Sequence, residues 1–423
     1  MIVRGNTPWF VSWGILGLVS AAVVWLSRSA WSAPAETTRS RALASLPYLQ
    51  GYKPPPPETG VISPRPDQAY PGYNFFVSGH DSAAYLMDMA GGIRHRWSKR
   101  YGEVWPEKPP PEEPSRWRRA LLFPNGELLA IFDDTGGLAK LDRDSNVIWR
   151  YGGRHCHHHL VVAEEGDIYV LTNERISRPP GLGGTGPVLD DQVTFLDSAG
   201  REKGSISILE CFLSSPYASL LEKPRDEFDI FHTNTLVVLD GRLEEKIPAF
   251  KRGNILLSIR NLDALVVLDP CSREIVWAAV GPWKAQHQPE MLPGGNILLF
   301  DNQGGGEGYS RVLEFDPVSR QVVWEFKGTS ANDFFSRTLG TVQPLPNGNI
   351  LVVESESGKA FELTPDKEEV WSFYNPHRIS DSGEKIAALY DLVRVDAGKL
   401  KFSDDVSPGH LPAPREGYPA GPQ

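Results

Sequence analysis

Two stretches of this chain share one pattern: Glu290-Met-Leu-Pro-Gly-Gly-Asn-Ile-Leu-Leu-Phe300 and Gln343-Pro-Leu-Pro-Asn-Gly-Asn-Ile-Leu-Val-Val353. In each, a Gly-Asn turn separates two apolar segments, another short segment follows, and the unit ends in Val-Trp, at Trp324 or Trp371. A strand-rich unit that recurs every roughly 40 to 50 residues is typical of a β-propeller, in which each copy forms one blade.

Four further copies of the unit lie upstream, over residues 74–97, 121–149, 160–197 and 235–277. Together with the two opening stretches they predict six blades. The segment 387–395 is expected to return to the first blade and close the ring, which would protect the edge strands. The sequence therefore predicts an all-β, six-bladed β-propeller over residues 70–400, with few helices.

Composition fits this fold and excludes one class of function. The chain has 12 Trp, 40 Gly and 36 Pro among 423 residues, which suits a turn-rich all-β domain. A net charge of −10 disfavours nucleic acid as a partner, because such binding needs a basic surface. Cys156, Cys211 and Cys271 show no paired spacing, so at most one disulfide is expected.

The N-terminus differs from the rest of the chain. Residues 9–26 form an uncharged apolar run long enough for a bilayer core, so residues 1–26 are predicted to be a transmembrane signal anchor. The alternative is a signal peptide cleaved near Ala33-Pro-Ala35, which would give a secreted protein. Either interpretation puts the propeller on the extracytoplasmic (periplasmic) side. Residues 27–69 are predicted to be a Pro-rich linker, and residues 401–423 a flexible tail.

Functional groups of a propeller gather at one end of its central channel, on the segments that begin the blades. Histidines are concentrated there: at least five of the ten lie in segments 155–159, 229–234 and 286–288. Converging imidazoles suit acid/base or nucleophilic catalysis. Arg311 follows Phe300-Asp-Asn-Gln303 and is expected at the same mouth, where a guanidinium suits a sulfate or phosphate ester.

These residues also carry a family resemblance. Asp229-x-x-His232-x-Asn234, Gln286-His287, the run ending at Asn302 and Ser310-Arg311 resemble the blade motifs of the arylsulfotransferase family. Tyr85 to Trp97 is similar to that family's opening blade, and the resemblance covers roughly residues 70 to 395. It implies a propeller that moves a sulfuryl group between phenolic compounds without a nucleotide donor. In such enzymes one histidine is transiently sulfated, while other histidines and an arginine hold the sulfate oxygens.

The resemblance assigns roles to particular residues. The predicted catalytic residues are His232, His287 and Arg311, and the predicted substrate-binding residues are His158, His159, Asn234, Asn302 and Gln343. The family's nucleophilic histidine is expected on the inner strand of the last blade, where this chain has Gly340-Thr-Val-Gln343. Glutamine cannot form a covalent sulfuryl intermediate, and the later His377 and His410 lie past the last blade. His287 is therefore the candidate to replace it as nucleophile or acid/base.

Structural interpretations of the same residues stay open. His232 and His287 would then bind backbone carbonyls, Arg311 would pair with Asp301, Asn302 would orient a turn, and residues 155–159 would form a solvated loop. A zinc or copper site with Cys156 is disfavoured by its poor geometry, so no metal or cofactor is expected. The expected partners are a small aromatic sulfate ester or phenol, and the membrane through the N-terminal helix.

Two functions are compatible with this interpretation of the sequence. One is an extracytoplasmic, arylsulfotransferase-like enzyme. The other is a non-catalytic propeller that binds an anionic or aromatic ligand, or a partner protein, at the same mouth. A quinoprotein dehydrogenase is suggested by Leu268 to Trp277, but six blades and the lack of adjacent cysteines argue against it.

Overall fold

The computed structural model describes residues 53–54, 56–62, 65–109, 115–132, 135–306, 308–379 and 385–402. The chain divides into two compact units, residues 1–47 and 48–423, and all described residues belong to the second. The predicted membrane segment 9–26, linker residues 27–52, His410 and most of the tail lie outside the described residues. Among the described residues, no helix is long and apolar enough to cross a membrane.

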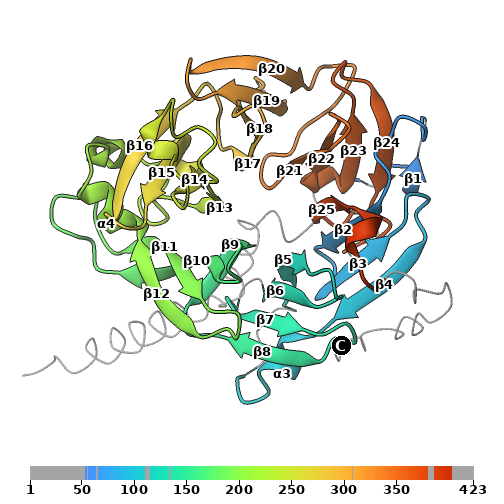
Figure 1. Ribbon diagram of the computed structural model, residues 1–423, viewed down its shortest axis with the longest axis horizontal. Helices are drawn as coiled ribbons and strands as arrows, with labels where there is room; N and C mark the ends of the chain where they lie inside the picture. The colour runs from blue at the N-terminus through green and yellow to red at the C-terminus, as the bar shows by residue number, and fades with distance from the viewer. Residues whose placement is uncertain are drawn as a thin grey trace, which may run out of the picture. The chain divides into compact units, whose positions relative to one another are not determined.

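Six antiparallel sheets lie around a common centre, which confirms the predicted six-bladed propeller (Figure 1). Innermost strand first, the blades are β25 (Leu389–Val395), β2 (Tyr73–Ser78), β3 (Ala83–Met87), β4 (Ile93–Ser98); β5 (Trp117–Leu122), β6 (Leu128–Phe132), β7 (Leu138–Leu141), β8 (Val147–Tyr151); β9 (His155–Val162), β10 (Ile168–Ile176), β11 (Val188–Leu196), β12 (Glu202–Ser207); β13 (Thr233–Val238), β14 (Ile255–Ile259), β15 (Ala264–Asp269), β16 (Glu274–Val280); β17 (His287–Met291), β18 (Ile297–Asp301), β19 (Arg311–Asp316), β20 (Gln321–Lys327); and β21 (Thr341–Pro344), β22 (Ile350–Glu354), β23 (Lys359–Leu363), β24 (Glu369–Tyr374), β1 (Gly60–Ile62).

The two ends of the domain close the ring together, as predicted. β25 supplies the inner strand of the first blade and pairs antiparallel with β2, with Phe75 opposite Val393. The inner edge strand that the first blade would otherwise lack is thereby provided by the C-terminal part of the domain.

Some residues of the predicted linker 27–69 contact the propeller. Gly60–Ile62 forms β1, which pairs with β24 as a fifth, outermost strand of the last blade. Lys53 Nζ also donates to Glu354 Oε1 at 3.0 Å. The proline-rich segment therefore ends in residues that are part of the propeller.

The repeated motif has a structural reason. The glycine of each Gly-Asn or Asn-Gly turn has a positive φ, for example 96° at Gly295 and 87° at Gly348. Such a conformation favours glycine, which lacks a Cβ. The terminal tryptophan of a blade binds the next blade: the indole of Trp97 donates to Gly126 O at 2.9 Å, and that of Trp371 donates to Met89 O at 3.2 Å. The tryptophans that end these blades thus join neighbouring blades.

Strands in the middle of the blades are buried on both faces, which explains their continuous apolar sequences. Every residue of β6, β14, β15 and β18 is buried. Helical segments among the described residues are short: α3 (Tyr101–Val104), α4 (Ile208–Leu213), and the 3₁₀ turns η2 (Ala218–Glu222), η3 (Pro248–Phe250), η4 (Arg260–Leu262), η5 (Ser355–Ser357) and η6 (Ala397–Lys399). All three cysteines are free thiols, so the single disulfide that the sequence allowed does not form.

Candidate functional site

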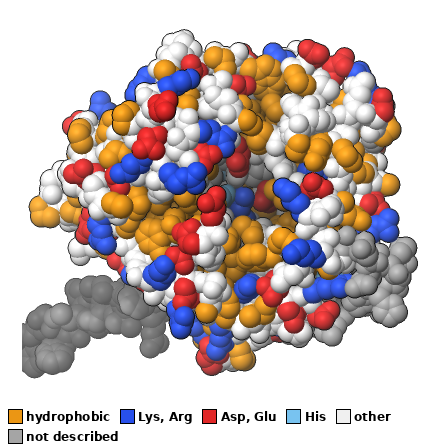
Figure 2. Space-filling view, in the orientation of Figure 1, with side chains coloured by type: hydrophobic (Ala, Val, Ile, Leu, Met, Phe, Trp, Pro, Cys, Tyr) orange, Lys and Arg blue, Asp and Glu red, His pale blue; other side chains and the backbone are white. Residues whose placement is uncertain are grey.

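All six inner strands, or the residues just before them, contribute to one small depression of about 20 Å³. It is lined by Arg118, Arg119, His158, Asn234, Thr235, His287, Gln288, Leu339, Gly340, Thr341 and Tyr390. Figure 2 shows the central hollow, with charged side chains around it. The three histidine-bearing segments therefore meet at the mouth of the channel.

The ring of His287 is held in one tautomer. Its Nδ1 lies 2.7 Å from Asn302 Oδ1 and 3.1 Å from Ala285 O, and both of these atoms are acceptors. The amide of Asn302 cannot be reversed without loss, because its Nδ2 donates to Ser336 O and Leu339 O. Nδ1 of His287 therefore carries the proton, and Nε2 keeps a lone pair. Burial, and then the nearby Arg260, lower the pKa of His287 well below its ordinary value.

His232 belongs to an aspartate–histidine dyad. Asp229 Oδ2 lies 2.5 Å from His232 Nδ1, and Asp229 Oδ1 accepts the backbone N–H of His232 at 3.0 Å. These two contacts fix both the ring and the backbone of His232. The hydrogen bond to His232 keeps the pKa of the Asp229 carboxyl below its usual value although burial acts in the opposite direction. Nδ1 of His232 is thus occupied by a carboxylate, and His232 itself does not line the depression.

His158 joins this group. Its ring centroid lies 4.8 Å from that of His232, and its Nδ1 lies 2.8 Å from Nδ1 of His157. Nε2 of His157 is in turn 3.6 Å from the buried Asp191. Burial, and then Arg118, lower the pKa of His158 well below its ordinary value. The predicted solvated loop at 155–159 is instead the start of the buried strand β9.

The backbone at the mouth adopts conformations that residues with side chains rarely take. φ is 50° at His158, 48° at His232, 47° at Gln288 and 61° at Leu339. Left-handed backbone at non-glycine residues costs of order 1 to 3 kcal/mol and is concentrated at functional sites. Four such residues lie near one end of the channel. Their strained backbone fixes the orientation of their side chains at a cost in stability, as is typical of a functional site.

Two arginines, Arg118 in the lining of the depression and Arg260 outside it, lie near His287. Arg118 lies over the ring of Tyr390, 5.4 Å from its centroid, and Arg260 Nη1 donates to the amide oxygen of Asn261 at 2.8 Å. Both are close enough to His287 to lower its pKa. Within the described part of the chain, neither forms an ion pair with a carboxylate. Their charges are therefore available to an anion bound beside His287.

Arg311, by contrast, is engaged elsewhere. Its Nε donates to Asp301 at 2.7 Å, one Nη to Glu325 at 2.9 Å, and the other to Pro282 O at 2.7 Å. Asp301 is fully buried, and Arg311 does not line the depression. Of the two interpretations of Arg311, the structure shows the ion pair with Asp301. The expectation that it reaches the channel mouth fails because β19 is the third strand of its blade, away from the centre.

The other predicted residues have different positions. Asn302 holds His287, and Asn234 supports the same segment by donating to Gln286 O at 2.7 Å. Gln343 exchanges two hydrogen bonds with the backbone of Arg394, at 3.0 and 2.7 Å, and so connects β21 to β25. His159 is buried, does not line the depression, and has no hydrogen-bond partner for either ring nitrogen among the described residues.

Sequence reasoning missed the two arginines on the second and fourth blades. The apolar run that marks the second blade in the sequence begins at Leu121, whereas β5 begins at Trp117 and so includes Arg118. The signal was present: Arg118-Arg119 precede an apolar strand as the histidines precede Leu160. Arg260 follows the second strand of its blade, in the turn η4, and no rule restricted to inner strands could have found it.

The sequence over residues 119–376 matches the arylsulfotransferase (ASST) family. The chain belongs to the arylsulfotransferase family. The match covers all or part of five blades, from β5 to β24. Membership of this family implies phenolic substrates in general.

No curated protein shows significant similarity to the chain. Solved structures resemble it distantly. A protein of unknown function from Bacteroides caccae has 12% identity and a TM-score of 0.48, over 75% of this chain and 97% of its own. Virginiamycin B lyase from Staphylococcus aureus has 11% identity and a TM-score of 0.37, over 61% and 69%. AztD from Citrobacter koseri has 10% identity and a TM-score of 0.40, over 80% and 98%. These similarities are too distant to indicate a reaction.

Proposed function

We propose that this arylsulfotransferase family member transfers a sulfuryl group from an aryl sulfate to a phenol, with His287 as the nucleophile. One observation carries the proposal. Asn302 and Ala285 fix the proton of His287 on Nδ1, which leaves a lone pair on Nε2, and His287 lines the depression together with Arg118, which forms no ion pair with any described carboxylate. An imidazole in that state can attack an electrophile without first losing a proton.

In the first half-reaction, Nε2 of His287 attacks the sulfur of the aryl sulfate. The N–S bond forms as the S–O bond to the aryl group breaks, and the electron pair of that bond leaves with the phenolate oxygen. The protonated ring of His232 supplies a proton to this oxygen, and Asp229 balances the positive charge of the ring. The products are a phenol and a sulfated His287.

The second half-reaction reverses these roles. The acceptor phenol gives its proton to Nε2 of His232 as its oxygen attacks the sulfuryl group. The S–O bond forms, the N–S bond breaks, and the electron pair returns to His287. Protons and charges balance over the cycle, because His232 regains the proton that it gave to the leaving group.

Arg118 and Arg260 would stabilise the charge on the sulfuryl oxygens. A preorganised donor aimed at a developing charge is typically worth about 10²- to 10³-fold in rate. His158 lies beside His232 and contributes a further polar contact to the bound group. The missing histidine at Gln343 then does not prevent catalysis, because a different imidazole has the free lone pair.

Steady-state kinetics with p-nitrophenyl sulfate and a phenol test this proposal. A sulfated intermediate predicts parallel lines in double-reciprocal plots, as expected of a ping-pong mechanism. His287→Ala should lower kcat by several orders of magnitude, whereas His159→Ala, which removes an imidazole that does not line the depression, should lower it far less. Equal losses in the two variants, or intersecting lines, would mean that His287 is not the nucleophile.

We further propose that the propeller works outside the cytoplasm, tethered by the apolar segment 9–26 or released after cleavage beyond it. The apolar run and the following Ala33-Pro-Ala35 motif motivate this placement. Protease added to intact spheroplasts should digest an anchored propeller. Protection of the propeller until the cells are lysed would overturn the proposal.

A further inference from the structure

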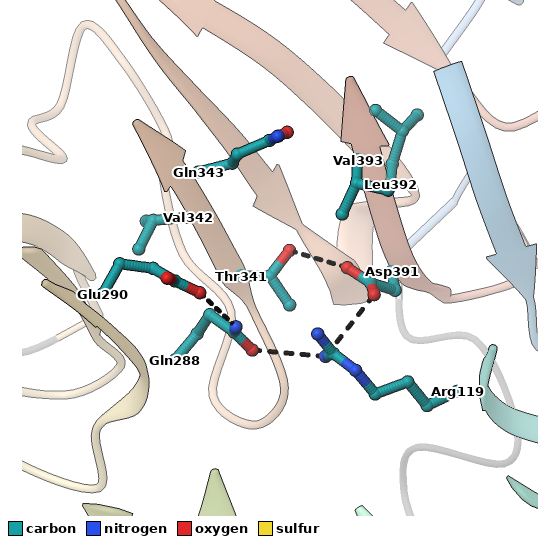
Figure 3. Close-up of a pocket in the computed structure, with 9 residues that line it drawn as sticks. All are labelled: Arg119, Gln288, Glu290, Thr341, Val342, Gln343, Asp391, Leu392 and Val393. Atoms are coloured by element: carbon teal, nitrogen blue, oxygen red, sulfur yellow. Dashed lines mark hydrogen bonds and ion pairs between the residues drawn. The ribbon is translucent and has the colours of Figure 1, made fainter. Parts of the chain in front are cut away.

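A larger cavity of about 200 Å³ lies next to the histidine site. We call it the acidic chamber. It is lined by Arg119, Gln288, Glu290, Thr341, Val342, Gln343, Asp391, Leu392 and Val393, whose side chains surround an open space (Figure 3). Arg119, Gln288 and Thr341 line both the chamber and the depression at His287, so the two spaces are neighbours.

The chamber lies further along the channel than His287. Glu290 follows His287 by three residues on β17. With a rise of about 3.3 Å per strand residue, the two side chains are offset by at most roughly 10 Å along the strand. The bulge in the pairing of β17 with β18 between these residues shortens that offset. One small organic ligand can therefore contact both His287 and the chamber.

The charges of the chamber are not balanced by the protein. Asp391 lies 3.4 Å from Arg119 and accepts from Thr341 at 3.3 Å. Glu290 accepts a hydrogen bond from the side-chain amide of Gln288 at 2.7 Å, and it forms no ion pair with any described residue. The same Gln288 accepts from Arg119 at 3.2 Å, so an amide stands between Glu290 and the guanidinium. Two carboxylates thus share one cation, and Glu290 is the group without a positive partner.

Burial makes this excess costly in the empty protein. It raises the pKa of Glu290, because a carboxylate away from water is disfavoured unless it is paired. A ligand that brings one positive charge and hydrogen-bond donors would relieve this cost. A ligand that brings a negative charge would add to it.

The size and the walls of the chamber indicate the rest of the ligand. A cavity of about 150 Å³ is enough to hold a benzene molecule, so 200 Å³ leaves room for a substituent on a ring. Val342, Leu392 and Val393 also line the cavity, although the side chains of Val342 and Leu392 pack in the hydrophobic clusters between blades. A phenol whose hydroxyl is near His287 carries its para substituent at the far end of the ring, toward the chamber.

We propose that the acidic chamber selects aromatic substrates that carry a cationic amine, which pairs with Glu290, and rejects those that carry an anion. The assignment to transfer substrates rests on the proposed function, whereas the binding of an aromatic amine to the chamber does not. The preferred acceptors are thus phenolic amines.

The first arm of the test compares three acceptors of similar size: para-aminomethylphenol, para-hydroxymethylphenol and para-hydroxybenzoate. The expected order of kcat/KM is amine, then alcohol, then carboxylate. Glu290→Gln should remove about tenfold or more of the preference for the amine over the alcohol, the scale of a hydrogen bond to a charged group. Glu164→Gln, the same change at a largely exposed carboxylate, is the matched control and should keep the preference.

The second arm measures binding without transfer. Benzylamine has no phenolic oxygen, and its binding by calorimetry should weaken about tenfold or more in Glu290→Gln but not in His287→Ala or Glu164→Gln. If the protein binds benzylamine through Glu290 but shows no transfer activity, the amine-binding proposal for the chamber is supported and the proposed transfer reaction is refuted. Transfer without any preference among the acceptors, or equal benzylamine affinity in Glu290→Gln, would overturn the chamber proposal. Because the substitution removes a half-buried carboxylate that forms no ion pair with any described residue, a loss of folding is not expected, and the thermal midpoint of each variant checks this.

Discussion

Two arginines, Arg311 and Arg118, should respond to substitution in opposite ways. Arg311 pairs with Asp301, which is fully buried and also accepts the backbone N–H groups of Lys284 at 2.7 Å and Gly304 at 2.9 Å. Arg311→Met leaves that carboxylate without its cation. Breaking a buried pair in this way costs about 3 to 5 kcal/mol. For a domain of this size, such a loss lowers the Tm by roughly 4 to 7 °C.

Arg118→Met should have little effect on stability and a large effect on anion binding. Its contact in the folded protein is the ring of Tyr390, a cation–π interaction worth about 0.5 to 1 kcal/mol at a partly exposed site. A hydrogen bond to a charged group contributes about 1.5 to 3 kcal/mol, so the affinity for p-nitrophenyl sulfate should fall roughly 10- to 150-fold. Arg311→Met should leave this affinity unchanged.

Differential scanning calorimetry and equilibrium binding, done on both variants, test this reasoning. The double variant Asp301→Asn with Arg311→Met is the control. Asn keeps the oxygen that accepts from Lys284 and Gly304 but carries no charge, so part of the lost stability should return. A tenfold loss of aryl-sulfate affinity in Arg311→Met at an unchanged Tm would refute the structural role of Arg311.

Three further outcomes are expected. Burial lowers the pKa of His159 below that of an unfolded histidine, so the unfolded chain binds the extra proton and stability falls as the pH drops below about 6.5. His159→Met should flatten this decline by up to about 1.4 kcal/mol per pH unit, as measured by denaturant unfolding at several pH values. An unchanged slope would contradict this prediction. Gln343→His should lower stability by about 1 to 3 kcal/mol in the same assay, because an imidazole cannot keep both bonds to the backbone of Arg394, and mass analysis should find no sulfate at that position. Asp229→Asn should lower kcat about 10²- to 10⁴-fold with little change in Tm, since it removes the charge behind His232, and full activity would exclude the dyad.

The fold could be predicted because its information is local and repeated. The Gly-Asn turns require a positive φ, and the closing tryptophans bind the next blade, so each unit of sequence specifies one unit of structure. The closure by β25 also followed from an apolar segment left over after six units. β1 was not predicted, because a three-residue outer strand after a run of prolines has no periodicity to detect.

The site was only partly predictable, since it depends on which side chains the channel brings together. The histidine segments could be identified from the sequence because histidine is rare elsewhere in the chain. Arginine is common, so Arg118 and Arg260 gave no comparable signal, and Arg311 was predicted from its position after residues 300–303 and from the family resemblance. Whether an arginine binds a substrate anion or a buried aspartate is decided by the strand that carries it, and strand order is visible only in the fold.

The most direct test of the central claim is to trap the intermediate. Protein mixed with p-nitrophenyl sulfate in the absence of acceptor should release one equivalent of p-nitrophenol in a burst, and peptide mass analysis at neutral to basic pH should find one sulfuryl group on His287. Addition of a phenol should remove it. A burst with the group on another histidine would move the nucleophile, and the absence of any burst or modified peptide in an active enzyme would contradict transfer through His287.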